Sequence, residues 1–514
     1  MRHLSVFAAG LLCYSILGGL AEAQSPPLKI SRETTFITDP IGSNGMPDYL
    51  MAVKQKMSAG ATHENNFWVL VWPALGNAEQ SSAEYIADVE RQLGITIPEQ
   101  GEYRTIKDFT EEVRRQHDRA SDGPWTREEC PLIAKWLDEN EQFLETVRRA
   151  SLRSHAYAAP VSMNDQQLLI YVLLPHVQRS RDIARQLNMR ANLRMQEGNF
   201  EGAWDDLLTS YRVASHVDKG FTIIERLVAT AIRNMTHETV CTWLSRTPDN
   251  ATKLAARRQV LMPLLEFSNM ADVVDTSERM MNLQLALMIV DGATARETID
   301  SVFNPEVLML NTGSGGDQEF QLIQELQAAR GPLMRYLIAG GDINATLKHI
   351  NSHFDAMTDA MRKPTHQERV LAFQEFEART SEDARLSQNG LQLIGEFVFA
   401  SDEDYETLPA RALLGALSPA ISAVNEASTR SIARRATLLA AFDVAEEIKR
   451  SGEIPTSLSS ESQLDPYIDL PLRYKVQGGE VVIYSVGQNL TDNGGRTFGE
   501  GDGMDDVRAT LLIP

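Results

Sequence analysis

The chain has 514 residues, with 49 Lys and Arg against 70 Asp and Glu, so its formal net charge is −21. A chain this acidic repels the phosphates of nucleic acid and anionic lipid surfaces, so we expect no nucleic-acid partner and consider cations its natural small partners. Its 43% hydrophobic residues are enough to build a large core, and its 3 cysteines exclude a disulfide framework.

Residues 1–23 predict a secretory signal peptide. Arg2 gives a short basic region, an apolar stretch runs from Leu4 to Leu20, and Ala21-Glu22-Ala23 fits an A-x-A cleavage site. We therefore expect export through the secretory pathway to the periplasm, the cell surface or the medium. Lipidation at Cys13 is disfavoured by the bulk of the preceding leucine, and a retained anchor is an alternative that the short, glycine-interrupted segment does not favour.

The mature chain is expected to have no transmembrane span. Its longest apolar run, Leu168 to Leu174, has about a third of the ~20 residues that a span needs, and Pro175 follows it. We interpret this run as part of the core. Cys130 and Cys241 permit one disulfide in an oxidising compartment without requiring it.

The hydrophobic periodicity predicts a mainly α-helical fold, with a small C-terminal α/β module that contains a short antiparallel sheet. We expect an extended lead-in over 24–62, a helical body over 63–427 and the tail module over 428–514. A T-x-x-E capping box lies at Thr126 to Glu129, and Pro131 starts a helix. The apolar face of that helix is expected to use Ile133, Trp136, Leu137, Phe143, Leu144 and Val147.

The stretch Ala191 to Ser215 predicts a helical hairpin. Its apolar and small residues have a tetratricopeptide-like spacing, and Gly198-Asn199 supplies the turn. Because such arrays need about three repeats and no second copy is evident, a generic helix hairpin is the favoured interpretation.

Beyond the hairpin, 304–318 breaks the helical pattern as a glycine-rich loop. The last helix is expected from about Thr429 to Arg450. Strands are expected at Leu472 to Val476, Glu480 to Val486 and Val507 to Leu512, with Gly478-Gly479 as a hairpin turn between the first two.

Two segments resemble proteins of the type IV pilin and type II secretion systems. Lys219 to Glu225 resembles a pilin cleavage motif, but charged residues interrupt the following helix, so we interpret it as an ordinary amphipathic helix start. The tail carries more of the resemblance: Gly452 to Leu458, Asp465-Pro466, Leu472 to Tyr474 and Tyr484 to Gly487 look like the globular end of a major pseudopilin.

The pseudopilin resemblance implies a calcium ion in the loop after the strand, held by backbone carbonyls and carboxylates. Asp492 and Asp505 match its acidic ligands, and Asn489, Asp502 and Asp506 are further candidates. The loop is rich in glycine, which permits tight wrapping, and calcium takes six to eight hard oxygen ligands. The alternative is a solvated acidic turn.

The whole chain also resembles a family of uncharacterised exported bacterial proteins of planctomycete type that carry such a tail behind a helical body. The residues that carry this resemblance include Asp48-Tyr49, Ala74 to Gly76, Trp136-Leu137, Glu197-Gly198 and Ala203 to Leu208. It implies export and architecture but no activity.

Other constellations favour structural interpretations. His349 and His353 have the spacing of two metal ligands on one helix face, but no clear third ligand accompanies them, so a polar surface is favoured. His237 to Cys241 departs from the zinc-protease pattern at its last position. Ser314 lies among glycines without the G-x-S-x-G elbow, so a linker is favoured. The 6 tryptophans are expected to fill the helical core rather than line a groove.

These patterns favour a non-catalytic binding or scaffold protein of the cell envelope, with a protein or another envelope component as its partner. The first alternative is a secreted hydrolase that uses dispersed carboxylates such as Glu197, Asp205 and Asp206. It requires these groups to converge in a cleft. The second alternative is an accessory of a secretion apparatus, which only the tail suggests.

Overall fold

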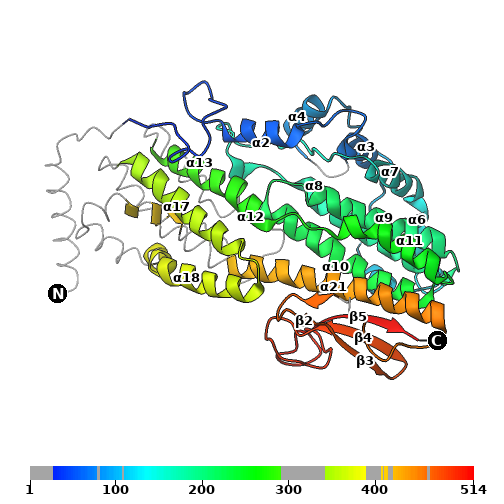
Figure 1. Ribbon diagram of the computed structural model, residues 1–514. Coiled ribbons are helices and arrows are strands. Elements are labelled where there is room, and N and C mark those ends of the chain that lie inside the picture. The colour runs from blue at the N-terminus through cyan, green and yellow to red at the C-terminus, as the bar shows by residue number, and fades with distance from the viewer. Residues whose placement is uncertain are drawn as a thin grey trace, which may run out of the picture.

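The computed structural model describes residues 27–77, 81–106, 109–290, 342–388, 421–459 and 463–513, with parts of 407–414. The expected signal peptide and the loop at 304–318 lie outside these residues. The described part is mainly α-helical with a small C-terminal sheet, which confirms the predicted fold class (Figure 1).

The helices precede the sheet in the chain. The first group is α2 (Tyr49–Ser58), α3 (Phe67–Leu75), α4 (Ala83–Leu93), α5 (Glu111–Asp122), α6 (Pro131–Glu139) and α7 (Glu141–Ser151). The second is α8 (Pro175–Gln196), α9 (Phe200–Val217), α10 (Ile223–Arg246), α11 (Ala251–Leu261), α12 (Met270–Val273), α13 (Arg279–Val290), α17 (Ile343–Met361), α18 (His366–Gln388) and α21 (Ile421–Ser451). Short 3-10 turns lie at Leu169–Tyr171 and Met262–Leu265, and a π-helical turn at Val274–Glu278 precedes α13.

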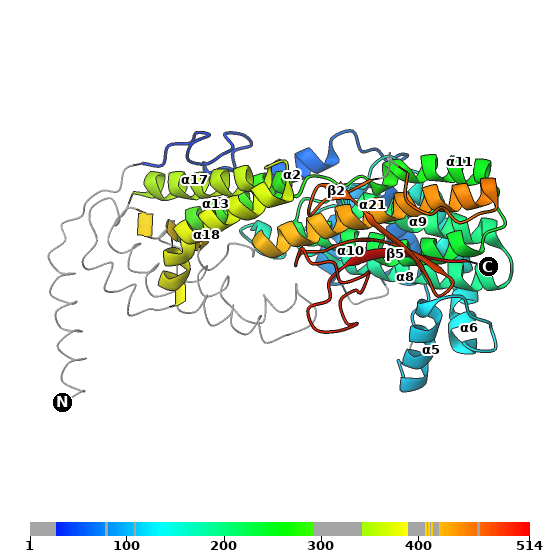
Figure 2. The same cartoon turned by 60° about the horizontal axis from the view of Figure 1, so that its bottom comes forward.

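The centre of the molecule is a bundle in which α8, α9, α10, α11 and α21 lie side by side. In Figure 1, α13, α17 and α18 extend this bundle at one end, and α3, α6 and α7 lie near the other. The sheet lies along α21 and α10, which both contact its last strand. Figure 2 shows α5 and α6 projecting from the opposite end of the bundle from α17 and α18.

The predicted helical hairpin is present as α8 and α9, which form the most extensive helix pair of the bundle. Gly198 has φ of 78°, a left-handed conformation that glycine adopts without a Cβ penalty. Asn199 then caps α9, because its side-chain oxygen accepts a 2.9 Å hydrogen bond from the Gly202 N–H. The pilin-like segment starts a helix as expected: Thr222 and Glu225 form a reciprocal capping box at the start of α10.

Three expected boundaries are wrong. The lead-in is not extended throughout, because Asp48 caps α2 by accepting from the Met51 N–H and the helix buries Tyr49. The helix expected from Pro131 onward divides into α6 and α7 at Asn140. The last helix begins at Ile421, before the expected start.

The break at Asn140 follows from its side chain, which is fully buried. The Asn140 amide accepts from the Arg104 N–H at 2.9 Å and donates to the Arg104 carbonyl at 3.0 Å. It also donates to the Trp136 carbonyl at 2.9 Å, which competes with the helical hydrogen bonds there. A side chain that bonds a distant backbone segment in this way favours a break that the local sequence pattern does not reveal.

The main sheet has three antiparallel strands in the order β3 (Arg473–Gln477), β4 (Glu480–Ser485) and β5 (Val507–Leu512). All three expected strands are confirmed to within one residue at each end. Gly478 and Gly479 both have positive φ, as a two-residue hairpin turn requires. A two-residue ladder pairs β1 (Leu464–Asp465) with β2 (Leu470–Pro471).

Buried apolar side chains form three large clusters. One lies among α3 to α10, a second joins α2, α12, α13, α17 and α18, and a third joins α8 to α11 and α21 to the sheet. In the third cluster Trp204, Trp243 and Phe442 of the helices belong to the same core as Ile483 and Leu511 of the sheet. The tail module is therefore packed into the helical body rather than tethered beside it.

The tryptophans fill these cores as predicted. Five are buried, and Trp136 is partly buried against the first cluster. Within the described ranges no helix has the length and apolarity needed to cross a membrane. Cys130 and Cys241 are both buried and free, so they form no disulfide.

Candidate functional site

The acidic loop connects β4 to β5 and is tied together by its own polar groups. The Asn489 N–H donates to Asp505 Oδ2 at 2.8 Å, and its side-chain amide donates to the Gly503 carbonyl at 2.7 Å and to Asn493 Oδ1 at 3.0 Å. The two ends of the loop therefore meet at Asn489. This arrangement orders a segment that has neither helical nor strand hydrogen bonds of its own.

Asp505 has one carboxylate oxygen that the loop does not satisfy. Asp505 Oδ2 accepts from Asn489, but Asp505 Oδ1 is buried and has no hydrogen-bond partner. Gly487, with φ of 71°, lies directly against this residue, and a Cβ there would collide with the Asp505 backbone carbonyl. A buried carboxylate oxygen without a donor is costly, and a bound cation is one way to compensate it.

Asp506 organises the loop from the inside. It is 1% exposed, and its carboxylate accepts from the Gly495 N–H at 2.7 Å and from the Asn493 N–H at 3.4 Å. Burial, with smaller contributions from the charges of Asp492 and Asp505, raises the pKa of Asp506 to about 6. The loop thus gathers negative charge that a divalent cation would neutralise.

The remaining candidates differ in their surroundings. Asp492 Oδ1 accepts from the Tyr484 hydroxyl at 3.0 Å and from the Gly494 N–H at 2.9 Å, while Oδ2 lies 3.6 Å from Arg473 Nε. Asp502 is exposed at the outer part of the loop. The structure therefore brings Asn489 and Asp505 into contact, places Asp492 and Asp506 close by, and leaves Asp502 at the surface.

These residues fit a calcium ion only with help from the backbone. No group of three or more His, Cys, Asp or Glu side chains in the described part of the chain is arranged to hold a metal ion. Asp505 Oδ1 is a buried carboxylate oxygen without a donor, and carbonyl oxygens of the loop and water would have to complete a shell of six to eight ligands. That donor set of hard oxygens suits calcium and not zinc.

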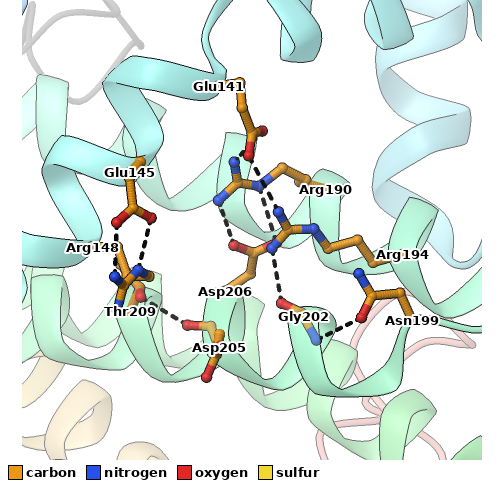
Figure 3. Close-up of polar contacts among 10 residues, drawn as sticks. All are labelled: Glu141, Glu145, Arg148, Arg190, Arg194, Asn199, Gly202, Asp205, Asp206 and Thr209. Atoms are coloured by element: carbon orange, nitrogen blue, oxygen red, sulfur yellow. Dashed lines mark hydrogen bonds and ion pairs between the residues drawn. The ribbon is translucent and has the colours of Figure 1, made fainter.

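A second polar cluster joins α7, α8 and α9 in the helical body (Figure 3). Asp206, 1% exposed, receives two hydrogen bonds from Arg190, at 2.6 and 3.1 Å, and one from Arg194 at 2.9 Å. Arg190 also donates to Glu141 at 2.7 Å, and Arg194 to the Gly202 carbonyl at 3.0 Å. Each charged group in this cluster thus has a partner of opposite charge.

Burial raises the pKa of Asp206 against the opposing effect of Arg190. Burial also works against the charged form of Arg190, but the Asp206 and Glu141 carboxylates outweigh it and raise the pKa of Arg190. Because one carboxylate faces two guanidinium groups, we take the ionic form as the native one. The cluster holds three helices together, as buried pairs do when all their hydrogen bonds are satisfied.

The three carboxylates named for a hydrolase do not converge. Asp206 is enclosed by arginines, Asp205 is exposed on the same helix, and Glu197 bonds Arg127 at 2.8 Å at the end of α8. The histidine pair on α17 also differs from expectation. His353 is buried, which lowers its pKa to about 4, and it lies edge-on to Phe376 in the second core. A polar surface is therefore the wrong interpretation for His353.

The segment His237 to Cys241 has a structural role that the sequence pattern did not reveal. His237 hydrogen bonds the backbone of Arg508, Cys241 that of Thr510, and Ser245 Oγ accepts from the Leu512 N–H at 2.9 Å. The three side chains are spaced four residues apart on α10, and their partners are alternate residues of β5. One face of α10 therefore provides hydrogen-bond partners along one edge of β5, whose other edge pairs with β4.

Comparison of the chain with protein-family models, with curated proteins and with solved structures finds no match in any of the three.

Proposed function

We propose that this chain is an exported, non-catalytic binding or scaffold protein of the cell envelope whose C-terminal module is stabilised by calcium. The observation that carries the proposal is the buried Asp505 Oδ1, which has no hydrogen-bond donor inside a loop already closed by Asn489 and Asp506. A calcium ion at this oxygen would satisfy the carboxylate and offset the negative charge of its neighbours.

The pseudopilin-like interpretation of the tail is part of this proposal. The loop follows strand β4, as the resemblance implies, and Asp505 is one of the two acidic positions matched to the ligands. Asp492 contributes through its charge near Asp506, while its oxygens hold Tyr484 and Gly494.

The scaffold role is supported by the way in which the helices are joined. The ion pairs of the Asp206 cluster hold α7, α8 and α9 together. The third core joins the sheet to the helices. Helices and sheet packed in this way can present a preorganised surface to a partner, which lowers the entropy cost of binding.

Calorimetric titration of calcium into chelator-treated protein tests the proposal. Saturable binding is expected, and Asp505→Asn should abolish it because the substitution removes the charge at the unsatisfied oxygen. Glu453→Gln is the matched control, since Glu453 is exposed in the same module but outside the loop. Absence of saturable binding by the unmodified protein would overturn the calcium site, and loss of binding in the control would show an effect of overall charge.

A further inference from the structure

A cavity of about 560 Å³ lies where the tail module meets the helical body. Its walls come from α10, α21, the start of β5 and the outer part of the acidic loop, and the lining includes His237, Glu238, Arg430, Arg434 and Phe498. The volume falls within the ~300–1,000 Å³ typical of small-molecule sites. Most of its lining surface is polar, so a ligand here is expected to be polar as well.

Two arginines in this cavity are weakly paired. Arg430 and Arg434 are one helical turn apart on α21, and burial, with a smaller contribution from the charge of Arg430, lowers the pKa of Arg434. Arg434 lies 3.5 Å from Glu238, and Arg430 lies 3.5 Å from Glu426. These distances exceed the 2.6–2.9 Å of the Asp206 cluster, so both guanidinium groups retain capacity to bind an anion.

Two buried polar atoms in the cavity lining have no hydrogen-bond partner. Arg434 Nε is a buried donor without an acceptor, and burial lowers the pKa of Arg434. His237 Nε2 is also without a partner, and the residue is 3% exposed. Burial lowers the pKa of His237 to about 3, so the ring is neutral near pH 7 and adds no positive charge to the cavity.

We propose that this cavity binds a carboxylate-bearing, hydroxyl-rich small molecule of the uronic-acid class. The carboxylate pairs with Arg434 and Arg430, whose planar guanidinium groups match its geometry. The ring hydroxyls face the polar side chains of the cavity lining. Phe498, 83% exposed beside the opening, supplies a flat apolar face for the sugar ring.

The third arginine of the lining is not part of this site. Arg508 donates to both oxygens of Glu500 at 2.9 Å and to the Gly495 carbonyl at 3.0 Å, so its charge is paired within the loop. Glu238 competes with the ligand: its side chain is 77% exposed and provides the carboxylate near Arg434 when no ligand is bound. Removal of this competitor should therefore strengthen binding.

The test is calorimetric titration of the purified protein with galacturonate, with galactose as the probe that lacks the carboxylate and acetate as the probe that lacks the ring hydroxyls. Chelator in all samples prevents calcium–galacturonate complexes. Galacturonate should bind with Kd of about 1 mM, as expected for a ligand of its size. Both comparison probes should bind at least about tenfold more weakly.

Three variants locate the site. Arg434→Gln should weaken galacturonate binding by about tenfold or more. Arg435→Gln is the matched control. The Arg435 side chain is 24% exposed and that of Arg434 is 25% exposed, but Arg435 pairs with Glu266 outside the cavity. Glu238→Gln should increase the affinity several-fold, a gain that misfolding does not produce.

Four results would overturn the proposal: no saturable galacturonate binding, equal affinity for galactose, equal affinity for acetate, or equal losses in the Arg434 and Arg435 variants.

Discussion

Replacement of Asp206 by Asn tests whether the buried cluster of α7, α8 and α9 stabilises the helical body. The change removes the buried carboxylate that accepts from both Arg190 and Arg194, while Glu141 stays 2.7 Å from Arg190 and 3.5 Å from Arg194. Removal of one partner from a buried ion pair costs about 3–5 kcal/mol. Because Glu141 still compensates part of the charge of Arg190, we expect the free energy of unfolding to fall by about 3 kcal/mol, the lower end of this range.

Thermal unfolding followed by circular dichroism measures this loss. Residues 67–246 contain most of the first core, and for a unit of this size 1 kcal/mol shifts the midpoint by about 2–4 °C. Asp206→Asn should therefore lower the midpoint by roughly 6–12 °C. The control is Asp205→Asn on the same helix, because Asp205 is exposed and surface changes stay within about 0.5 kcal/mol. Similar shifts in the two variants would refute a stabilising role for the cluster.

Three further predictions concern other parts of the molecule. Burial lowers the pKa of His216 to about 4, below its ordinary value of 6.5. The unfolded chain therefore binds the proton more readily, and the protein loses stability as the pH falls from about 6.5 toward 4. His216→Gln should flatten this part of a plot of the thermal unfolding midpoint against pH. Ser245→Ala removes the acceptor for the Leu512 N–H and should cost about 1 kcal/mol in urea unfolding, whereas Thr242→Ala, which loses only a bond within α10, should cost less. Gly487→Ala should destabilise the tail more than Gly494→Ala in limited proteolysis, because both glycines have φ near 70° but only Gly487 lies against Asp505; equal cleavage rates would contradict the close approach.

Much of the fold is predictable from local sequence signals. The strands of the tail follow their β-branched and aromatic residues, and Gly478-Gly479 supplies the turn that joins two of them. Gly198-Asn199 likewise marks the α8–α9 hairpin. These elements are predictable because turn geometry and helix capping depend on a few neighbouring residues.

The sequence did not reveal features that depend on distant contacts. Asn140 breaks a helix because it bonds the backbone of Arg104, 36 residues away. His237, Cys241 and Ser245 look unrelated until β5 lies beside α10, although their four-residue spacing is a signal of a shared helix face. The candidate loop residues come from the pseudopilin resemblance, but only the fold distinguishes Asp505, with its unsatisfied oxygen, from Asp506, which accepts from backbone N–H groups.

The proposed calcium site in the acidic loop is tested most directly by a crystal structure of the protein grown with calcium. The proposal predicts an ion at about 2.3–2.6 Å from Asp505 Oδ1, with loop carbonyl oxygens and water completing six to eight ligands. A structure in which Asp505 Oδ1 is bonded to water or to a side chain, with no ion in the loop, would contradict it.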